Sequence, residues 1–388
     1  MTERLYYNDS YLTEFRANVI DVSPDRRRVV LDRTAFYPSS GGQPFDRGTL
    51  EGRTVVDVVD EEDRIVHILD AALGQTSPVT GLVDWARRFD HMQQHTGQHL
   101  LSAVLLELFN FPTVSFHLGA ESSTIDVAAA ALEARQVLAA EERANALVFE
   151  NRPVTVEYGQ SSEDLGLRKA TQREGAIRVV AIAGVDRNAC GGTHVRSTGE
   201  IGPLLLRKLE KMRANIRIEF LCGSRAVRQA RADFDRLSAV ARVFSAPLDD
   251  APELAQAQVE KLQEAEKVRK KLALELAQIR GRQRYLETVP DSAGLRWVVL
   301  RLPVLTDDLR AEAQSFTGGQ KAVFLAAGEE PPAILFATSS DSGIGAGERL
   351  KPVLASVGGR GGGNSVLAQG SVLSKSALEI VVQTLTQK

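Results

Sequence analysis

HTGQH at residues 95–99 decides how this chain is organised, together with CGGTH at residues 190–194. Each segment carries two good zinc ligands separated by three residues. In a helix this spacing places both side chains on one face, a single turn apart. The two pairs supply three imidazole nitrogens and one thiolate sulfur, a donor set that suits tetrahedral Zn²⁺. We therefore expect His95, His99, Cys190 and His194 to hold one zinc ion per chain.

The two pairs support each other, because a single pair of histidines is often only a polar helix face. The whole chain has six histidines and two cysteines, so two such pairs are hard to obtain by chance. The two glycines of CGGTH should let the backbone turn tightly, so that Cys190 and His194 converge without a helix. His91 extends the helical stripe, but eight residues of helix separate it from His99 by about 12 Å. We expect His91 to lie beside the metal and not to bind it.

Length and composition describe an ordinary globular protein of two or three domains. The chain has 388 residues, of which 43% are hydrophobic and 25% charged. It has no run of eighteen apolar residues, and its first residues form no apolar signal segment. With only Cys190 and Cys222, a disulfide framework is excluded, which favours a reducing cytoplasm. Cys222 lies in an apolar run and is expected to be buried and inert.

Charge alone does not identify a partner. The net charge is −3, and the basic residues are concentrated locally. Basic clusters on helices are often only solvated faces, so these segments permit RNA binding without demonstrating it. The basic segments are residues 26–28, 87–88, 207–217 and 269–284.

The pattern of apolar residues predicts an α+β protein. Residues 1–88 carry short strands punctuated by turn residues, which is typical of a small antiparallel β-barrel. From about residue 87 to 110 the period becomes helical, and residues 89–240 are expected to form a zinc-binding α+β domain on an antiparallel sheet. The expected strands are 15–22, 28–31, 48–59, 65–69, 122–127, 154–158, 177–182, 202–208 and 216–221, with a second helix at about 128–150.

The C-terminal part is expected to contain a helical connector and a further domain. Residues 241–290 read as helix with two or three imperfect heptads, which fits an antiparallel hairpin and a short dimeric coil equally well. Residues 291–388 alternate strands and helices, as in a small α/β domain. Residues 357–365, VGGRGGGNS, are the one compositionally biased segment. A homodimer through the connector or the C-terminal domain is a further expectation.

Three separated segments resemble one known family. HTGQHLLSA (residues 95–103) and NACGGTHVRSTGEIG (188–202) resemble the editing domain of alanyl-tRNA synthetase and its free-standing relatives. RTAFYPSSGGQPFDRGTL (33–50) resembles the small barrel that precedes that domain. VGGRGGGNSVLAQGS (357–371) resembles the glycine-rich motif of the synthetase's C-terminal domain, which engages tRNA. The resemblance covers nearly the whole chain and implies a long, free-standing editing protein that acts in trans.

The resemblance implies hydrolysis of the ester that links a wrong amino acid to tRNA(Ala), chiefly serine and also glycine. An alanine pocket cannot strongly reject an amino acid that differs by one small group, so a second, hydrolytic site is needed. The resemblance also makes His95, His99, Cys190 and His194 the zinc ligands. No general base is identified.

Further site residues follow from the same resemblance. Thr96 and Gln98, beside the ligands, are candidates for catalysis or substrate contact, with helix positions that face solvent as their alternative. Independently of the resemblance, His117 follows a predicted strand of the same domain and is a candidate for the same roles, with a structural histidine as its alternative. Many relatives carry a small hydroxyl residue where this chain has Gln98, which leaves open how the serine hydroxyl is recognised; the hydroxyl of Thr96 is an alternative to Gln98 for that contact. Gln43 could face RNA or belong to a turn. The expected tRNA-binding residues are Gly358, Gly359, Arg360, Gly361, Gly362 and Gly363, whose backbone could approach phosphates closely.

Two alternative functions stay open at this point. Four protein ligands describe a closed, structural zinc, which would fit a non-catalytic tRNA-binding protein. A related zinc pattern occurs in threonyl-tRNA synthetase, so the edited tRNA could be a mischarged tRNA of the threonyl type. The barrel, CGGTH and the glycine-rich segment favour the alanyl type.

Overall fold

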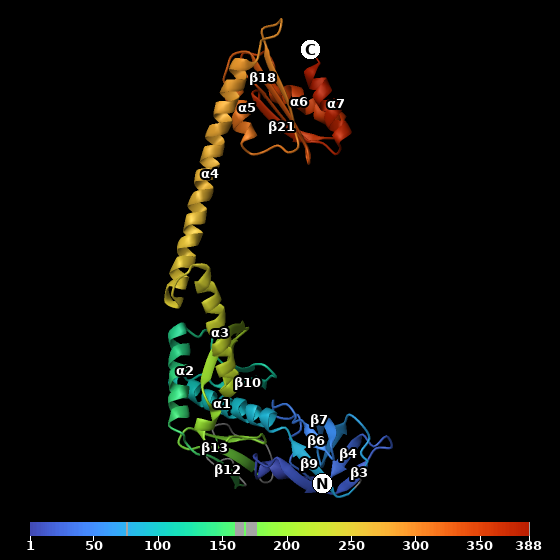
Figure 1. Ribbon diagram of the computed structural model, residues 1–388, viewed down its shortest axis with the longest axis vertical. Helices are drawn as coiled ribbons and strands as arrows, with labels where there is room; N and C mark the ends of the chain where they lie inside the picture. The colour runs from blue at the N-terminus through green and yellow to red at the C-terminus, as the bar shows by residue number, and fades with distance from the viewer. Residues whose placement is uncertain (75–76, 160–166, 168–176, 388) are drawn as a thin grey trace. The chain divides into compact units, whose positions relative to one another are not determined.

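The computed structural model describes residues 1–74, 77–159, 167 and 177–387. The chain divides into two compact units, Met1–Val240 and Ala241–Lys388. Both units combine helices with sheets that are largely antiparallel, so the class is α+β as expected (Figure 1). No helix in the described part of the chain is long and apolar enough to cross a membrane. The finer division into four domains stays a prediction.

The first unit begins with a seven-stranded antiparallel sheet in the order β2-β9-β6-β7-β8-β4-β3. Its inward side chains, such as Leu50, Val58 and Ile65, form one buried core. The expected closed barrel is not found among the described strands, because no ladder joins the edge strands β2 and β3. These two strands follow each other along the backbone, separated by Asn18, and do not pair. The strands are β2 Glu14–Ala17, β3 Val19–Val22, β4 Arg28–Leu31, β6 Gly48–Leu50, β7 Arg53–Glu61, β8 Arg64–Leu69 and β9 Val79–Val83.

A short segment that precedes this sheet in the sequence contributes residues to the candidate functional site described below. Strand β1 (Glu3–Arg4) pairs in parallel with β5 (Arg33–Thr34), and the 3₁₀ turn η1 (Leu5–Tyr7) follows it. Between β5 and β6 runs a loop that contains the FYPSSGGQP segment. Asp46 of this loop forms a fully buried ion pair with Arg88, the fourth residue of the next helix. The loop is therefore fixed to that helix.

Helix α1 (Trp85–Phe109) is the central element of the first unit. The Asp84 side chain accepts a hydrogen bond from the Arg87 backbone N–H and caps its start. Asn110 ends the helix with φ of 56°, in the left-handed conformation that closes many helices. Most of its residues from Arg88 to Leu105 are buried, polar ones included. The helix therefore lies between protein layers, and its polar side chains need protein or ligand partners.

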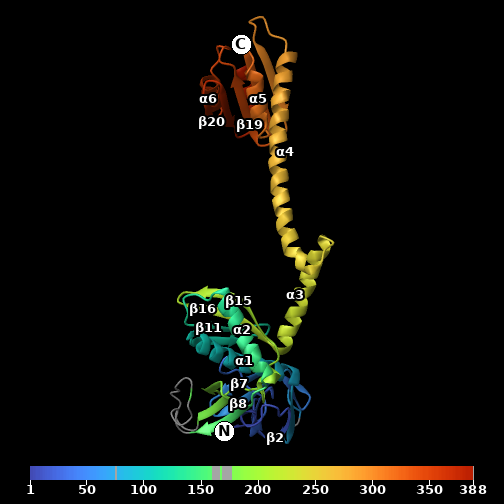
Figure 2. The ribbon, with the colours of Figure 1, turned by 90° about the vertical axis from the view of Figure 1, so that its left-hand side faces the viewer.

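Helix α1 packs with α2 (Ala134–Phe149) against the sheet β10-β11-β16-β15 (Figures 1 and 2). This core contains Leu101, Val104, Ile125, Leu147 and Phe220. A smaller sheet, β12-β13-β14, completes the unit, and helix α3 (Gly223–Val243) leaves it. The strands are β10 Thr113–Leu118, β11 Ser123–Val127, β12 Val154–Gly159, β13 Ile177–Ile182, β14 Asp186–Ala189, β15 Leu204–Met212 and β16 Asn215–Cys222, with the 3₁₀ turn η2 at Thr198–Ile201.

The second unit holds a five-stranded sheet in the order β17-β18-β19-β21-β20. Helix α5 covers one face, and α6 and α7 cover the other, each with its own apolar cluster. The expected helical connector contains α4, whose C-terminal part packs on α5 through contacts such as Arg284 with Glu312. The elements are the 3₁₀ turn η3 Leu248–Asp250, α4 Ala251–Glu287, β17 Arg296–Leu302, α5 Leu309–Thr317, β18 Ala322–Glu329, β19 Pro332–Thr338, α6 Ala346–Ser356, β20 Arg360–Gly363, β21 Leu367–Ser371 and α7 Lys375–Thr386.

The glycine-rich segment forms the edge strand β20 of this sheet and pairs with β21. A Cβ atom on Gly361 would lie 2.4 Å from the Gln369 carbonyl oxygen of β21 and 2.7 Å from the Leu354 side chain of α6, so this glycine allows both elements to pack closely on the strand. By contrast, Gly362 has open space where a Cβ atom would lie. Close packing therefore requires glycine at position 361, whereas position 362 has room for a side chain.

Candidate metal centre

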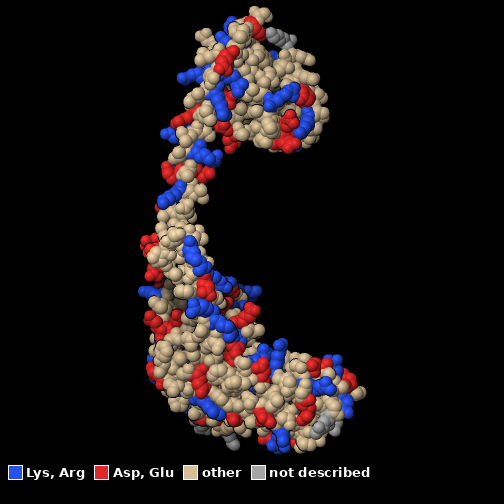
Figure 3. Space-filling model, in the orientation of Figure 1, with Lys and Arg blue, Asp and Glu red and all other residues tan. Residues whose placement is uncertain are grey.

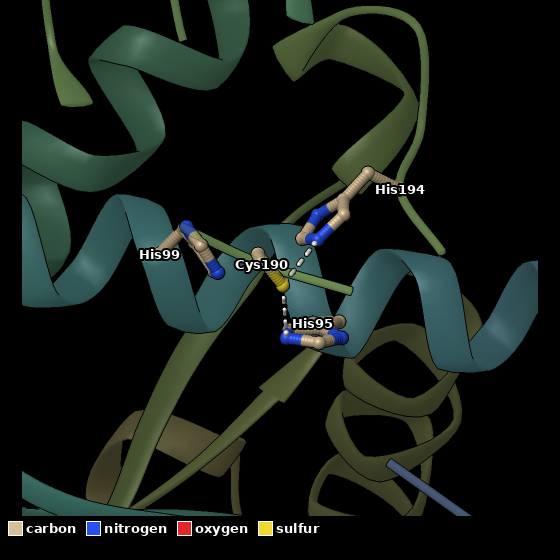
Figure 4. Close-up of side chains that lie close together, drawn as sticks. All are labelled: His95, His99, Cys190 and His194. Atoms are coloured by element: carbon tan, nitrogen blue, oxygen red, sulfur yellow. Dashed lines mark hydrogen bonds between the residues drawn. The ribbon is translucent and has the colours of Figure 1, made fainter. Parts of the chain in front are cut away.

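Helix α1 presents His95 and His99 one turn apart, as the spacing predicts, and both are buried. Cys190 and His194 approach the same point from the loop after β14 (Figure 4). The ligand atoms of these four residues all lie within 4.8 Å of one another. The structure therefore brings together all four predicted ligands, and the group could bind a metal ion.

Two of the distances between donor atoms are close to those of a tetrahedral zinc site. With zinc–ligand bonds of about 2.0–2.3 Å, the donors of a tetrahedral site lie about 3.3–3.8 Å apart. The Cys190 Sγ lies 3.2 Å from Nε2 of His194 and 3.5 Å from Nε2 of His95. Three imidazoles with one thiol are also a donor set that zinc prefers.

The glycines of CGGTH allow the loop to lie close to neighbouring side chains and are not needed for a tight turn. Neither Gly191 nor Gly192 has positive φ. A Cβ atom on Gly192 would overlap the imidazole ring of His95, and one on Gly191 would lie 3.4 Å from the Tyr7 hydroxyl. The expectation of a loop that converges without a helix is met, but the reason for Gly192 is steric.

Each histidine of the group has a partner at its Nδ1 atom. His99 Nδ1 lies 3.2 Å from a carboxylate oxygen of Asp186, and His194 Nδ1 lies 3.1 Å from the Thr96 hydroxyl. His95 Nδ1 lies 2.8 Å from the amide oxygen of Gln43. A carboxylate and an amide oxygen only accept, so Nδ1 of His99 and of His95 donates. Such partners fix the tautomer of ligating histidines and leave Nε2 free for a metal.

Arg178 fixes the loop that carries Cys190 by hydrogen bonds to its backbone. Its Nη1 atom donates to the backbone carbonyls of Cys190 at 2.6 Å and Gly192 at 3.1 Å. Its Nε atom donates to the Tyr7 carbonyl at 3.1 Å. Arg178, which belongs to β13, therefore links the cysteine loop and the N-terminal segment by hydrogen bonds.

The electrostatic environment prepares the thiol for metal binding. Burial opposes ionisation of Cys190, but the neighbouring His95 and His194 outweigh it and hold its pKa well below the ordinary value. The thiolate is the form that binds zinc. Burial also lowers the pKa of His99, but hydrogen bonds to Asp186 and Cys190 raise it overall, to about 9.

Three of the four residues border a cavity of about 310 Å³, within the size range of small-molecule sites. His95, His99 and Cys190 line one side of it, and Arg4, Tyr7 and Tyr37 come from the N-terminal segments. A purely structural zinc is normally enclosed by protein. Here the ligands face a space that can admit part of a substrate.

The predicted candidates beside the ligands have different positions. Gln98 lines the cavity, and its amide nitrogen donates to the Ser102 hydroxyl at 2.8 Å. Thr96 is buried against His194 and also accepts from the Val195 N–H at 3.3 Å. His117 lies on β10 with an exposed side chain and is not among the residues that line the cavity.

The remaining histidine of the stripe lies outside the metal group. His91 is buried, and its Nδ1 atom has no hydrogen-bond partner in the described part of the chain. Burial and the nearby Arg87 lower its pKa to about 4.

Sequence reasoning did not assign Asp186 and Arg178, and it left the role of Gln43 open. Gln43 and Asp186 lie 52 and 87 residues from the histidines that they contact. Spacing along the chain carries no signal for such contacts. Asp186 had the best local signal, as a carboxylate four residues before Cys190.

Two family profiles match the chain. Residues 177–219 match the profile described as the threonyl and alanyl tRNA synthetase second additional domain. Residues 9–87 match the profile described as tRNA synthetases class II (A).

Curated relatives match over much longer stretches. The chain is 33% identical to the alanyl-tRNA editing protein AlaX-L of Pyrococcus horikoshii, over 97% of this chain and 96% of the relative. It is 34% identical to the alanyl-tRNA editing protein Aarsd1 of Mus musculus, over 70% of each chain. It is 31% identical to the alanine–tRNA ligase of Pyrococcus abyssi over 99% of this chain, but spans only 44% of the ligase.

One solved structure, the C-Ala domain from Aquifex aeolicus alanyl-tRNA synthetase, matches 26% of this chain and 97% of that domain at 22% identity, with a TM-score of 0.21. That score is too low to support a conclusion about the fold. The match to AlaX-L extends over nearly the full length of both proteins, and the metal group lies within it. The chain therefore belongs to the alanyl-tRNA editing protein family, whose members are aminoacyl-tRNA deacylases.

Proposed function

We propose that this protein hydrolyses mischarged tRNA(Ala) in trans, with Ser-tRNA(Ala) as its main substrate and Gly-tRNA(Ala) as a second one. Water adds across the ester bond, which releases the free amino acid and leaves the terminal ribose of the tRNA with its hydroxyl. The observation that carries the proposal is that His95, His99 and Cys190 of the His₃Cys group line a cavity. His95, His99, Cys190 and His194 would hold one zinc ion, which would supply Lewis acidity beside the ester.

Selection of serine is assigned to Gln98. Its amide nitrogen is engaged by Ser102, whose hydroxyl also accepts a hydrogen bond from Thr113 at 2.7 Å. This arrangement fixes the side chain and leaves the amide oxygen as an acceptor for the hydroxyl of serine. An alanyl ester offers no donor there, and an unpaired buried polar group costs about 1–3 kcal/mol. Thr96 is assigned to hold His194, and His117 has no part in the proposal.

The second unit is assigned to tRNA binding. Arg360 of β20 lines a groove over the sheet together with Arg310, Gln369 and Ser371. Its guanidinium is exposed and can reach a phosphodiester. On the visible face of each unit, acidic and basic side chains are interspersed (Figure 3). Tight tRNA binding would therefore depend on local contacts such as this one.

The test is a panel of purified Ser-, Gly- and Ala-tRNA(Ala) and a mischarged tRNA(Thr), incubated with the full chain. We expect the seryl ester to be cleaved fastest, the alanyl ester to be spared, and a strong chelator to abolish cleavage. Cys190→Ala should retain tRNA binding and lose deacylation. A seryl ester that decays no faster than in buffer overturns the assignment. Cleavage confined to tRNA(Thr) would move the protein to threonyl-type editing.

A further inference from the structure

The GGQ segment, residues 41–43, lies in the loop between β5 and β6. It forms a tight turn that brings Gln43 to the metal group. Ser40 and Gln43 exchange two backbone hydrogen bonds, of 3.2 and 2.9 Å. Between them, Gly41 and Gly42 have φ of 52° and 81°. Positive φ at both central residues is what a type I′ turn requires, and glycine provides it without strain. The turn reading of the two glycines is thus confirmed, and the turn places Gln43 at its end.

The Gln43 side chain is buried and contacts both ligand segments. Its amide nitrogen donates to the Thr193 hydroxyl at 2.8 Å, and its amide oxygen accepts from the Thr193 backbone N–H at 3.2 Å. A backbone N–H can only donate, so the oxygen of the amide must be the atom that faces it. The same oxygen lies 2.8 Å from His95 Nδ1. His95 must therefore carry its proton on Nδ1. Its Nε2 atom, on the side of Cys190, then has a free lone pair that can bind a metal.

Gln43 differs in origin from the other partners of the histidines. Thr96 belongs to α1 and Asp186 to β14, both within the part of the unit that carries the ligands. Gln43 comes from the loop between β5 and β6 of the N-terminal segment. Two further contacts fix that loop: the buried pair of Asp46 with Arg88, and a hydrogen bond from the Leu118 N–H to the Gly42 carbonyl of 3.2 Å. The loop that carries Gln43 is thus fixed both to α1 and to β10.

We propose that Gln43 is a positioning residue of the zinc site, through which the N-terminal sheet sets the orientation of His95 and of the CGGTH loop. This inference rests on the proposed zinc ion and not on the identity of the ester. It implies that the N-terminal sheet is part of the metal centre. Loss of the Gln43 amide should weaken the metal site even where the fold is kept.

The experiment measures metal binding directly in the full chain. Gln43→Met keeps the length of the side chain and removes the acceptor and the donor, so it should fold. We expect its zinc dissociation constant, from competition with a chromophoric chelator, to rise about 10–100-fold, as for other partners of metal-binding histidines. The d–d absorption of the Co²⁺-substituted protein should change in shape. Ser39→Ala removes a hydrogen bond to Phe45 in the same loop without touching the metal group, and should behave as the parent.

A second variant keeps the proposal testable if Gln43→Met does not fold. Gln43→Glu retains an acceptor for His95 and Thr193, and carboxylates commonly serve metal-binding histidines. Its zinc affinity and Co²⁺ spectrum should stay close to those of the parent. Parent-like binding in folded Gln43→Met, or loss of binding in Gln43→Glu as large as that expected for Gln43→Met, contradicts the inference. If the parent binds zinc but cleaves no ester, only the proposed function fails.

Discussion

The sulfur of Cys222 lies 2.3 Å from the point where a Cβ atom on Gly97 would be, which is closer than two non-bonded atoms can approach. Gly97 is the central residue of HTGQH, and Cys222 ends β16 in the core beneath α1. Cys222 is fully buried, as expected. The contact sets how closely the helix approaches the sheet, and therefore where His95 and His99 lie. Cys222 is thus a spacer for the metal centre.

This contact predicts a coupled pair of substitutions. Gly97→Ala should destabilise the first unit by about 1–3 kcal/mol, because overpacking forces the helix away from the sheet. Cys222→Ala should cost about 1 kcal/mol by itself, through the small cavity that it leaves. The double variant should recover part of the loss. Urea unfolding followed by Trp85 fluorescence in a Trp297→Phe background measures this, and strictly additive losses would contradict the contact.

Asp186 should control zinc affinity through His99. Asp186→Asn keeps the shape but loses the charge that strengthens the hydrogen bond to Nδ1. We expect zinc to bind about 10-fold more weakly, the lower end of the range for such partners. Chelator competition provides the measurement. Glu157→Gln is the matched control and should leave zinc affinity unchanged, because this carboxylate of strand β12 in the same sheet pairs with Arg187.

Gln98 should set the choice among amino acids. Gln98→Ala removes the proposed acceptor, so the preference for the seryl over the glycyl ester should fall by about 10-fold, the value of one hydrogen bond of about 1.4 kcal/mol. Ser102→Ala should reduce the same ratio less, because it only frees the Gln98 amide. The measurement is kcat/KM for both esters. An unchanged ratio in Gln98→Ala would show that serine is recognised elsewhere.

The clustering of the four predicted ligands could be predicted from the sequence because its signal is local. Pairs at four-residue spacing need only one helix and one short loop to bring their donors together. The partners of those ligands could not be predicted, since Gln43 and Asp186 reach the histidines through the fold. The strand β20 was also missed: a glycine run has no side-chain pattern, and only its ladder with β21 reveals it. In contrast, α7 carries apolar residues at 378, 381, 382 and 385, a helical signal that was available.

His67 predicts a loss of stability in mild acid. It is fully buried in the N-terminal sheet, where Nδ1 donates to the Val29 carbonyl at 3.1 Å. Burial is the main cause that lowers its pKa from 6.5 to about 4, although the hydrogen bond to Val29 opposes it. Between these values the unfolded chain binds a proton that the folded chain does not, so stability should fall as pH decreases from about 6.5 to 4. The full loss is about 3 kcal/mol at 1.36 kcal/mol per pKa unit.

The control for this prediction is His67→Gln. That variant should be less stable at pH 7, but its stability should depend less on pH between 6.5 and 4. Urea midpoints at pH 7, 6 and 5 in the Trp297→Phe background provide the comparison. Parallel pH profiles for parent and variant would exclude His67 as the source.

Arg360 should contribute one phosphate contact. Arg360→Ala ought to weaken tRNA(Ala) binding and reduce the slope of log K against log salt by about 1, as expected when one cation–phosphate contact is lost. Arg310→Ala, in the same groove, should act in the same direction. Arg301→Ala is the control, because that arginine is already paired with Glu379. If Arg360→Ala and Arg310→Ala both keep the parental slope, as Arg301→Ala should, the groove is not a phosphate site, and the phosphate contacts of tRNA must lie elsewhere on this protein.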